Sequence, residues 1–279
     1  STRILGELEF DPVSMAVGGD FIVVGGQRAE LAVARLSDPC SSTTVVRSGG
    51  SINNFVALDQ QPAAMPRRRF RDSAAFVEDG VTNLNIMSSQ STPRLLVCNN
   101  DHTVRLLSLP DLDLITELKF PTAVNYASED ASFSCDFNQS SELFAVGSQD
   151  GYVTVWDIRS QQQKLVQLET FQHGRSRGAC RNVKFSPSGS VDLLAFSEHS
   201  SFVNISDTRC FEKRQILRVG GNEEVLTPDS PTLVDQDYQI TGLRFAYDSS
   251  ALFVGLEGSI LEYSVDRIGR HSFPSSAII

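Results

Sequence analysis

Residues 141–160, SELFAVGSQDGYVTVWDIRS, constrain the fold more than any other part of the chain. Two apolar runs with alternating character, Leu143–Val146 and Tyr152–Trp156, flank a Gln149-Asp150-Gly151 reversal. Strand-forming residues on both sides of an Asp-Gly turn are typical of a β-hairpin. The segment therefore predicts two antiparallel strands, the second of which ends in Trp156-Asp157.

The same pattern recurs along the chain at a spacing of about fifty residues. Residues 191–210 and 93–112 align with the first segment, and weaker copies lie at 19–38 and 250–266. Trp156 has no counterpart in three of the other copies, where Leu107, Ser206 and Tyr263 stand at its position. Self-similarity at a fixed period indicates a repeat architecture, in which each copy forms one supersecondary unit.

Further strand patterns flank these copies on both sides. In the upstream segments the apolar residues alternate, as in Phe133, Cys135 and Phe137, which predicts strands with one buried face. The downstream segments have the composition of outer strands. The upstream segments are 81–89, 132–137, 181–189 and 241–250, and the downstream segments are 113–120, 164–171 and 215–220.

The N-terminal segment 3–10, RILGELEF, is similar to the outer-strand segments 113–120 and 164–171, yet no copy precedes it. We expect it to dock on the last copy, at 241–266, and thereby cover exposed sheet edges. The alternative is a frayed arm. The chain begins with Ser rather than Met, which fits a fragment, a processed form or a sequence with omitted segments.

The hairpin that ends in Trp156-Asp157, together with its copies, resembles the WD40 repeat. The resemblance implies an all-β, WD40-type β-propeller whose ring is closed by the N-terminal strand. Five blades are recognisable, and the chain length leaves six or seven open. We expect one domain over residues 1–279, with polar insertions at about 38–80 and 219–238. The second insertion, acidic and rich in Pro, is expected to be a surface loop.

Composition narrows the class of protein. The formal net charge is −10 and 41% of the residues are hydrophobic, as in a globular protein with a sizeable core. No stretch reaches the roughly 18 apolar residues that a membrane-spanning helix needs. The five Cys show no spacing of a disulfide framework, and Cys98 and Cys135 lie within strand patterns. These observations predict a cytoplasmic or nuclear protein without membrane contact.

Catalytic and nucleic-acid signatures are weak. The chain has no Gly-x-Ser-x-Gly elbow, phosphate-cradling loop or His-Glu-x-x-His motif, and its four His are widely separated. We therefore expect no enzyme, catalytic residue, metal or cofactor. The Arg67–Arg71 stretch, RRRFR, has basic and aromatic groups that contact nucleic acid in other proteins. In a chain with a pI of about 4.9, a solvated loop is the favoured interpretation.

The propeller resemblance implies where binding residues would lie. In that fold the turns between the middle strands and the loops that enter the inner strands gather around a central channel, and rigid scaffolds carry binding on such loops. The polar, partly acidic residues there suit a peptide whose positive amine is held by carboxylates. The candidate peptide-binding residues are Asp101, His102, Tyr126, Asp130, Glu198, His199 and Glu257.

A second resemblance covers the C-terminal part of the chain. Residues 192–218 and 240–266 are similar to a family of fungal WD40-like proteins, one member of which is a substrate receptor of the GID (CTLH-type) ubiquitin ligase and recognises protein N-termini. The resemblance implies a non-enzymatic substrate-recognition subunit within a multi-subunit complex. Two alternatives remain open: a general scaffold for complex assembly, and a propeller enzyme of the hydrolase or lyase class.

Overall fold

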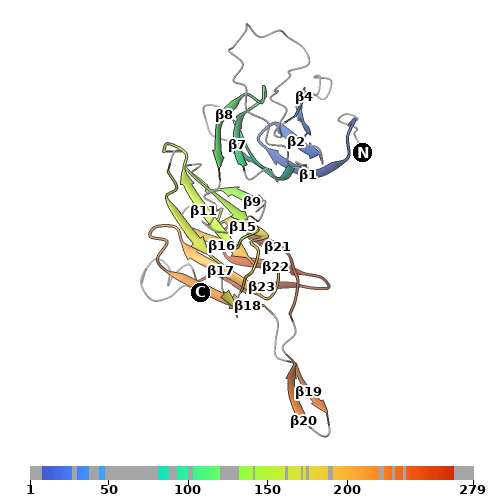
Figure 1. Ribbon diagram of the computed structural model, residues 1–279, viewed down its shortest axis with the longest axis vertical. Coiled ribbons are helices and arrows are strands. Elements are labelled where there is room, and N and C mark those ends of the chain that lie inside the picture. The colour runs from blue at the N-terminus through green and yellow to red at the C-terminus, as the bar shows by residue number, and fades with distance from the viewer. Residues whose placement is uncertain are drawn as a thin grey trace. The chain divides into compact units, whose positions relative to one another are not determined.

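A computed structural model provides the structure of the protein. The structure describes several separate ranges of the chain. Every regular element in these ranges is a β-strand (Figure 1), as the sequence predicts. The described ranges are 8–26, 30–37, 44–47, 81–87, 93–99, 103–119, 132–140, 142–160, 163–170, 172–173, 176–187, 191–219, 223–227, 230–234 and 237–266.

The chain divides into two compact units. The first comprises residues 1–137 and 158–163 and contains two four-stranded antiparallel sheets, β1-β2-β3-β4 and β5-β6-β7-β8, followed by β9. Neighbouring strands in these sheets are also neighbours in sequence, so each sheet is a simple meander. The strands are β1 (Pro12–Gly18), β2 (Phe21–Gly26), β3 (Glu30–Arg35), β4 (Thr44–Arg47), β5 (Val81–Met87), β6 (Arg94–Asn99), β7 (Thr103–Ser108), β8 (Leu114–Lys119) and β9 (Ser132–Phe137).

The second unit comprises residues 138–157 and 164–279. In it β10, β11 and β12 pair in sequence order, β15 to β18 form a four-stranded meander, and β21 to β23 form a three-stranded one. Two short hairpins, β13-β14 and β19-β20, complete the described strands. The bounds are β10 (Leu143–Ser148), β11 (Tyr152–Asp157), β12 (Val166–Glu169), β13 (Gln172–His173), β14 (Ser176–Arg177), β15 (Asn182–Phe185), β16 (Leu193–Ser197), β17 (Phe202–Asp207), β18 (Arg214–Arg218), β19 (Glu223–Thr227), β20 (Ser230–Val234), β21 (Ile240–Phe245), β22 (Ala251–Leu256) and β23 (Ile260–Ser264).

The five repeated segments all form the predicted hairpins. Their strand pairs are β2-β3, β6-β7, β10-β11, β16-β17 and β22-β23. The seven flanking segments also contain strands: β5, β9, β15 and β21 upstream, and β8, β12 and β18 downstream. Alternation and Asp-Gly-type turns thus located the strands, and the all-β prediction is confirmed.

Within each unit, successive sheets pack against one another through their faces. β1 contacts β5 and β5 contacts β9 in the first unit, while β15 contacts both β10 and β21 in the second. The apolar cores lie between the faces of these sheets. β16 shows the consequence, since Leu193 and Ala195 enter one core while Leu194 and Phe196 enter the other. A strand buried on both faces reads as a continuous apolar run, which explains LLAFS.

The two polar insertions contain strands that the sequence did not reveal. In place of the surface loop expected over 219–238, the structure has the β19-β20 hairpin (Figure 1), with Glu223 paired to Val234 and Thr227 to Ser230. The insertion at 38–80 contains β4, which pairs with β3. β4 (TVVR) has strand-forming residues but is only four residues long, and β19 and β20 (EEVLT and SPTLV) contain Glu and Pro, which are depleted in strands, so local sequence carries little signal for these elements.

Only part of the predicted closing strand lies within the described residues. Residues 8–10 carry no strand, whereas β1 begins just after them at Pro12. Phe10 lies against Gly26 of β2, because a Cβ added to Gly26 would be 2.5 Å from its ring. Closure of a ring by residues 3–10, and the number of blades, stay predictions.

Candidate functional site

The β10-β11 turn is held by its own side chains. The Ser148 hydroxyl contacts the Asp150 carboxylate and lies 3.1 Å from the Tyr152 carbonyl oxygen. Gly151 has a φ of 80°, in the left-handed region that favours glycine, and its N–H donates to the Ser148 carbonyl at 3.2 Å. The Asp150 carboxylate therefore orders the turn.

The equivalent β16-β17 turn is held by a different side-chain contact. Glu198 follows β16 and is buried, with 4% of its surface exposed, and Asn204 Nδ2 of β17 donates to its carboxyl group at 3.2 Å. Gly178 makes room for this side chain, because a Cβ added there would lie 2.5 Å from a Glu198 carboxyl oxygen and 3.1 Å from its Cβ. The sequence-based expectation that Glu198 is an open acceptor on a solvated turn is corrected: its carboxyl group belongs to the interior of the sheet packing.

Residues 178–182, which lead into β15, connect the two turns. The Cys180 N–H donates to the Ser148 carbonyl at 3.0 Å, and the Arg181 N–H donates to the Ser197 carbonyl at 3.0 Å. Burial raises the pKa of the Cys180 thiol strongly, and the charges of Glu198 and Asp150 raise it further. Cys180 thus lies within electrostatic reach of the carboxyl groups of both turns.

Residues 237–240 extend this arrangement to the next sheet. Ser201 donates its N–H to the Tyr238 carbonyl at 2.9 Å and its hydroxyl to Asp237 at 2.6 Å. The Ile240 N–H donates to the His199 carbonyl at 3.1 Å, and Ile240 pairs with Leu256, which precedes the β22-β23 turn. The β16-β17 and β22-β23 turns therefore lie at the same end of their sheets.

We call these connected segments the turn face. Their exposed side chains offer amide, imidazole, hydroxyl and carboxylate groups. The turn face comprises residues 148–151, 178–182, 198–201, 237–240 and 256–259. Its exposed polar side chains are Gln149, His199, Asp237, Gln239, Glu257 and Ser259.

The predicted binding residues divide into three groups. His199 and Glu257 are exposed on the turn face, and the backbone of Ile240 connects their turns. Glu198 directly precedes His199 in sequence but is buried. The other four, Asp101, His102, Tyr126 and Asp130, lie outside the described residues.

The Trp-Asp end of β11 shows how the repeat packs. Trp156 is 3% exposed and stacks on Phe144, its cross-strand partner, with ring centroids 5.3 Å apart and an interplanar angle of 14°. In the next sheet Asp207 occupies the position of Asp157. Its buried carboxylate accepts two hydrogen bonds from the Arg209 guanidinium, at 3.1 and 3.0 Å. The Trp156 contact is made across the hairpin, whereas the Asp207 contact is made with a residue that follows β17.

Comparison with known families supports this interpretation of the fold. Residues 123–157 match the family described as WD domain, G-beta repeat. The chain contains a WD40 repeat. Residues 178–218, which run from the turn face through β18, match a family described as an uncharacterised protein domain, DUF2415. A WD40 repeat supports a protein-binding or scaffold role.

Two fungal proteins are similar to this chain. An uncharacterized protein of Schizosaccharomyces pombe is 25% identical over 313 residues, an alignment that spans 98% of this chain and 79% of the relative. An uncharacterized protein of Saccharomyces cerevisiae is 31% identical over 88 residues, which is 32% of this chain and 12% of the relative. The first similarity extends over almost the whole chain rather than over one blade.

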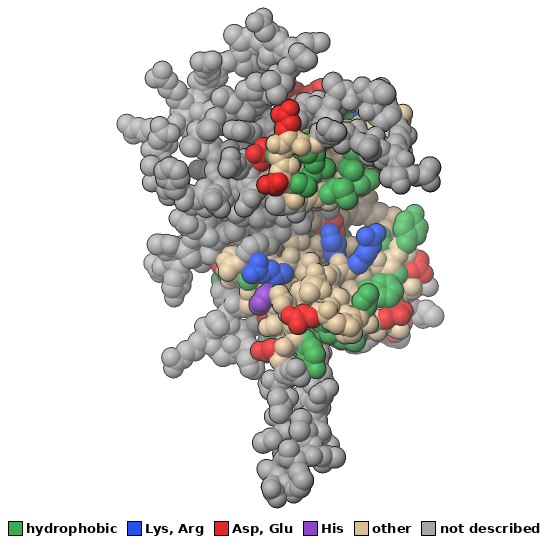
Figure 2. All heavy atoms as spheres, turned by 90° about the vertical axis from the view of Figure 1, so that its right-hand side faces the viewer, with side chains coloured by type: hydrophobic (Ala, Val, Ile, Leu, Met, Phe, Trp, Pro, Cys, Tyr) green, Lys and Arg blue, Asp and Glu red, His purple; other side chains and the backbone are tan. Residues whose placement is uncertain are grey.

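The described residues contain neither a metal-ligand cluster nor a membrane-spanning helix. No group of three or more His, Cys, Asp or Glu in them is placed to hold a metal ion. In the same part of the chain no helix has the length and hydropathy to cross a membrane. Figure 2 shows basic and acidic side chains near one another on the exposed surface of the second unit.

Proposed function

We propose that this chain is a non-enzymatic, peptide-binding propeller and that the turn face is its recognition surface. The observation that carries the proposal is the bond from the Ile240 N–H to the His199 carbonyl, which holds the turns of His199 and Glu257 at one end of two packed sheets. Side chains on turns anchored this way are held in place before a ligand arrives, which lowers the entropy cost of binding.

The ligand proposed is a protein N-terminus. Glu257 and Asp237 are exposed carboxylates on the turn face, and a free α-amino group is a compact cation that such groups can accept. Glu198 has a different part in this proposal. Its buried carboxyl group holds the turn through Asn204, and it positions His199 rather than contacting the peptide.

The biological role proposed is that of a substrate-recognition subunit of a ubiquitin ligase. Its support is the resemblance of residues 192–218 and 240–266 to the fungal WD40-like family that includes such a receptor, together with the WD40 match over 123–157. We propose a location in the cytoplasm or the nucleus, on the basis of the Cys pattern in the sequence. A general assembly scaffold is the alternative protein-binding role.

Peptide binding can be tested with a library of peptides that differ in their first residues, prepared with free and with acetylated N-termini. We expect binding by free termini and at least tenfold weaker binding after acetylation. Glu257→Lys on the turn face should weaken binding at least tenfold. Glu262→Lys, an equally exposed charge reversal on β23 of the same sheet, is the matched control and should bind normally. Equal binding by both variants would show that the recognition surface lies elsewhere.

The ligase role has a separate test. Affinity purification of the full chain, followed by mass spectrometry, should recover ubiquitin-ligase subunits with the native protein and with Glu257→Lys alike. The proteins whose turnover depends on this chain should be lost from the Glu257→Lys sample. Recovery of a stable complex without ligase subunits would favour the scaffold.

A further inference from the structure

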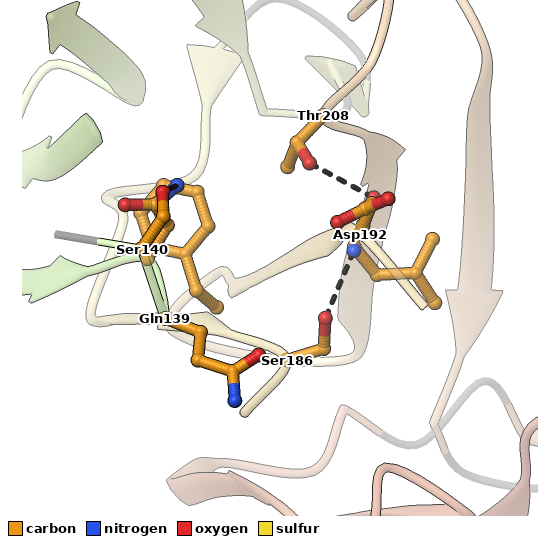
Figure 3. A pocket seen from close by; sticks show the side chains of 8 residues that line it. Gln139, Ser140, Ser186, Asp192 and Thr208 are labelled. Atoms are coloured by element: carbon orange, nitrogen blue, oxygen red, sulfur yellow. Dashed lines mark hydrogen bonds between the residues drawn. The ribbon is translucent and has the colours of Figure 1, made fainter. Parts of the chain in front are cut away.

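A polar pocket lies in the second unit, away from the turn face. Its volume is about 470 Å³, within the usual range of roughly 300–1,000 Å³ for ligand pockets. In Figure 3, Gln139 and Ser140 line one side and Ser186, Asp192 and Thr208 line the other. The eight lining residues are Asn138, Gln139, Ser140, Phe185, Ser186, Asp192, Leu193 and Thr208.

The strands place this pocket at the opposite end of the sheet from the turn face. Asp192 and Leu193 line the pocket where β16 begins, and Glu198 follows β16 at its other end. At about 3.3 Å per residue, the five residues of β16 separate the two by roughly 16 Å. A ligand in the pocket and a peptide on the turn face can therefore bind at the same time.

Hydrogen bonds shape both walls before any ligand enters. On one side, Asn138 Oδ1 accepts the N–H groups of Glu142 and Leu143, and Asn138 Nδ2 donates to the Ser140 hydroxyl at 2.9 Å. On the other, the Thr208 hydroxyl donates to the Asp192 carbonyl at 3.0 Å. The walls are thus ordered without using the side-chain amide of Gln139, which makes no hydrogen bond within the described part of the chain.

The polar groups that remain specify the ligand. The Gln139 amide offers one donor and one acceptor group, the same pair that a peptide unit presents. The Ser186 hydroxyl accepts the Leu193 N–H at 3.0 Å and keeps its proton for donation. No Lys or Arg is found among the described residues that line the pocket, and Asp192 is its charged member. The lining therefore disfavours phosphate and carboxylate ligands and suits neutral or basic peptide.

We propose that this pocket binds an extended, uncharged or basic segment of a partner protein, as a second docking site that is independent of the turn face. The segment lies against Phe185 and Leu193, with its backbone hydrogen-bonded to Gln139. A protein with two docking sites at opposite ends of one sheet can hold a ligand at one end while attached to an assembly at the other.

The test uses the full chain and a display library of random twelve-residue peptides that are fused through their N-termini, so that no peptide presents a free α-amino group. We expect selection of peptides poor in Asp and Glu. Their affinity should fall at least tenfold for Gln139→Arg, which adds bulk and positive charge at the pocket. It should also fall for Thr208→Val, which keeps the shape of the side chain but removes its hydroxyl.

Gln149→Arg is the matched control, because Gln149 is an exposed turn glutamine at the other end of β10. This variant and Glu257→Lys should bind the selected peptides with unchanged affinity, and circular dichroism should show that all four variants are folded. Failure to select any peptide, or equal binding by Gln139→Arg and Gln149→Arg, would overturn the proposal. Either result leaves the test with free N-termini at the turn face unaffected.

Discussion

The β10-β11 and β16-β17 hairpins share one sequence pattern but are stabilised by different contacts. The first keeps the Ser148, Asp150 and Trp156 set, and its turn is ordered by its own side chains. At the equivalent positions the second has Glu198, Ser200 and Ser206, and none of these residues repeats the original contacts. Its turn is instead held by Asn204 from β17 and by residues 237–240 from the next segment.

Both turns also accept a backbone hydrogen bond from the segment that enters the next sheet, Cys180 to Ser148 in the first and Ile240 to His199 in the second, so the difference lies in the side-chain contacts. The strand pairing is the same in both, with Phe144 opposite Trp156 and Leu194 opposite Ser206. Where the local network is lost, contacts from distant residues keep the turn in place. These distant contacts link the second turn to the neighbouring sheet, so the divergent repeat is also the one whose turn is connected to the β22-β23 turn.

The largest effect is expected at the position where the two hairpins differ most in size. Trp156→Ala should lower the free energy of unfolding by about 3–5 kcal/mol, because a large buried ring is replaced by a cavity. Ser206→Ala, the equivalent change in the second hairpin, should have an effect below about 1 kcal/mol. Urea denaturation followed by circular dichroism measures both. Equal effects would mean that the two positions are packed alike.

The next effect concerns the buried carboxyl group of the second turn. Glu198→Ala should cost about 1–3 kcal/mol, because the amide of Asn204 then loses a partner inside the protein. Glu198→Gln should recover most of this loss, since the amide oxygen still accepts the bond. Thermal unfolding of the two variants provides the measurement. A Glu198→Ala protein as stable as the native one would show that the turn is held by residues 237–240 alone.

A smaller effect on stability is expected at the equivalent turn positions Asp150 and Ser200. Asp150→Ala should cost about 0.5–1.5 kcal/mol, through loss of the contact with the Ser148 hydroxyl. Ser200→Ala, at the equivalent position, should change stability by less than about 0.5 kcal/mol. Hydrogen exchange at the Gly151 and Ser201 amides reports the local opening of each turn. Faster exchange at Ser201 in the Ser200→Ala protein would contradict the non-local model.

The smallest effect is expected on the chemistry of Cys180, which lies between the two turns. Because burial and the nearby carboxyl groups raise the pKa of its thiol, the unreactive neutral form persists at physiological and mildly alkaline pH. Exposed Cys210 should therefore react with a maleimide much faster than Cys180. Both Asp150→Ala and Glu198→Ala should accelerate the reaction at Cys180. Mass spectrometry of labelled peptides over time would show which turn controls access.

The sequence predicted the parts of the fold that depend on local pattern. The period of about fifty residues, the alternation in SFSCDF and the Asp-Gly turn were enough to locate five hairpins and seven flanking strands. These features arise from contacts between residues a few positions apart, and such contacts leave a periodic signal.

The site could be predicted only in part. His199 and Glu257 were chosen as turn residues, and both are exposed on the turn face. Glu198 was chosen for the same reason, yet it is buried because Gly178 and Asn204 accommodate its carboxyl group. Gly178 is twenty positions before Glu198, and the two have no pattern in common. Burial of a polar side chain depends on residues that only the packing of strands brings near.

The amino-acid sequence by itself determined the five hairpins, the strands that flank them and the WD40 character of the chain, because side-chain alternation and turn chemistry act over short distances. The tertiary structure decided which carboxyl groups are exposed, which turns share a face and where the polar pocket lies. These depend on how sheets pack on one another: Ile240 joins the turns of His199 and Glu257, and Gln139 and Asp192, 53 positions apart in sequence, line the same pocket.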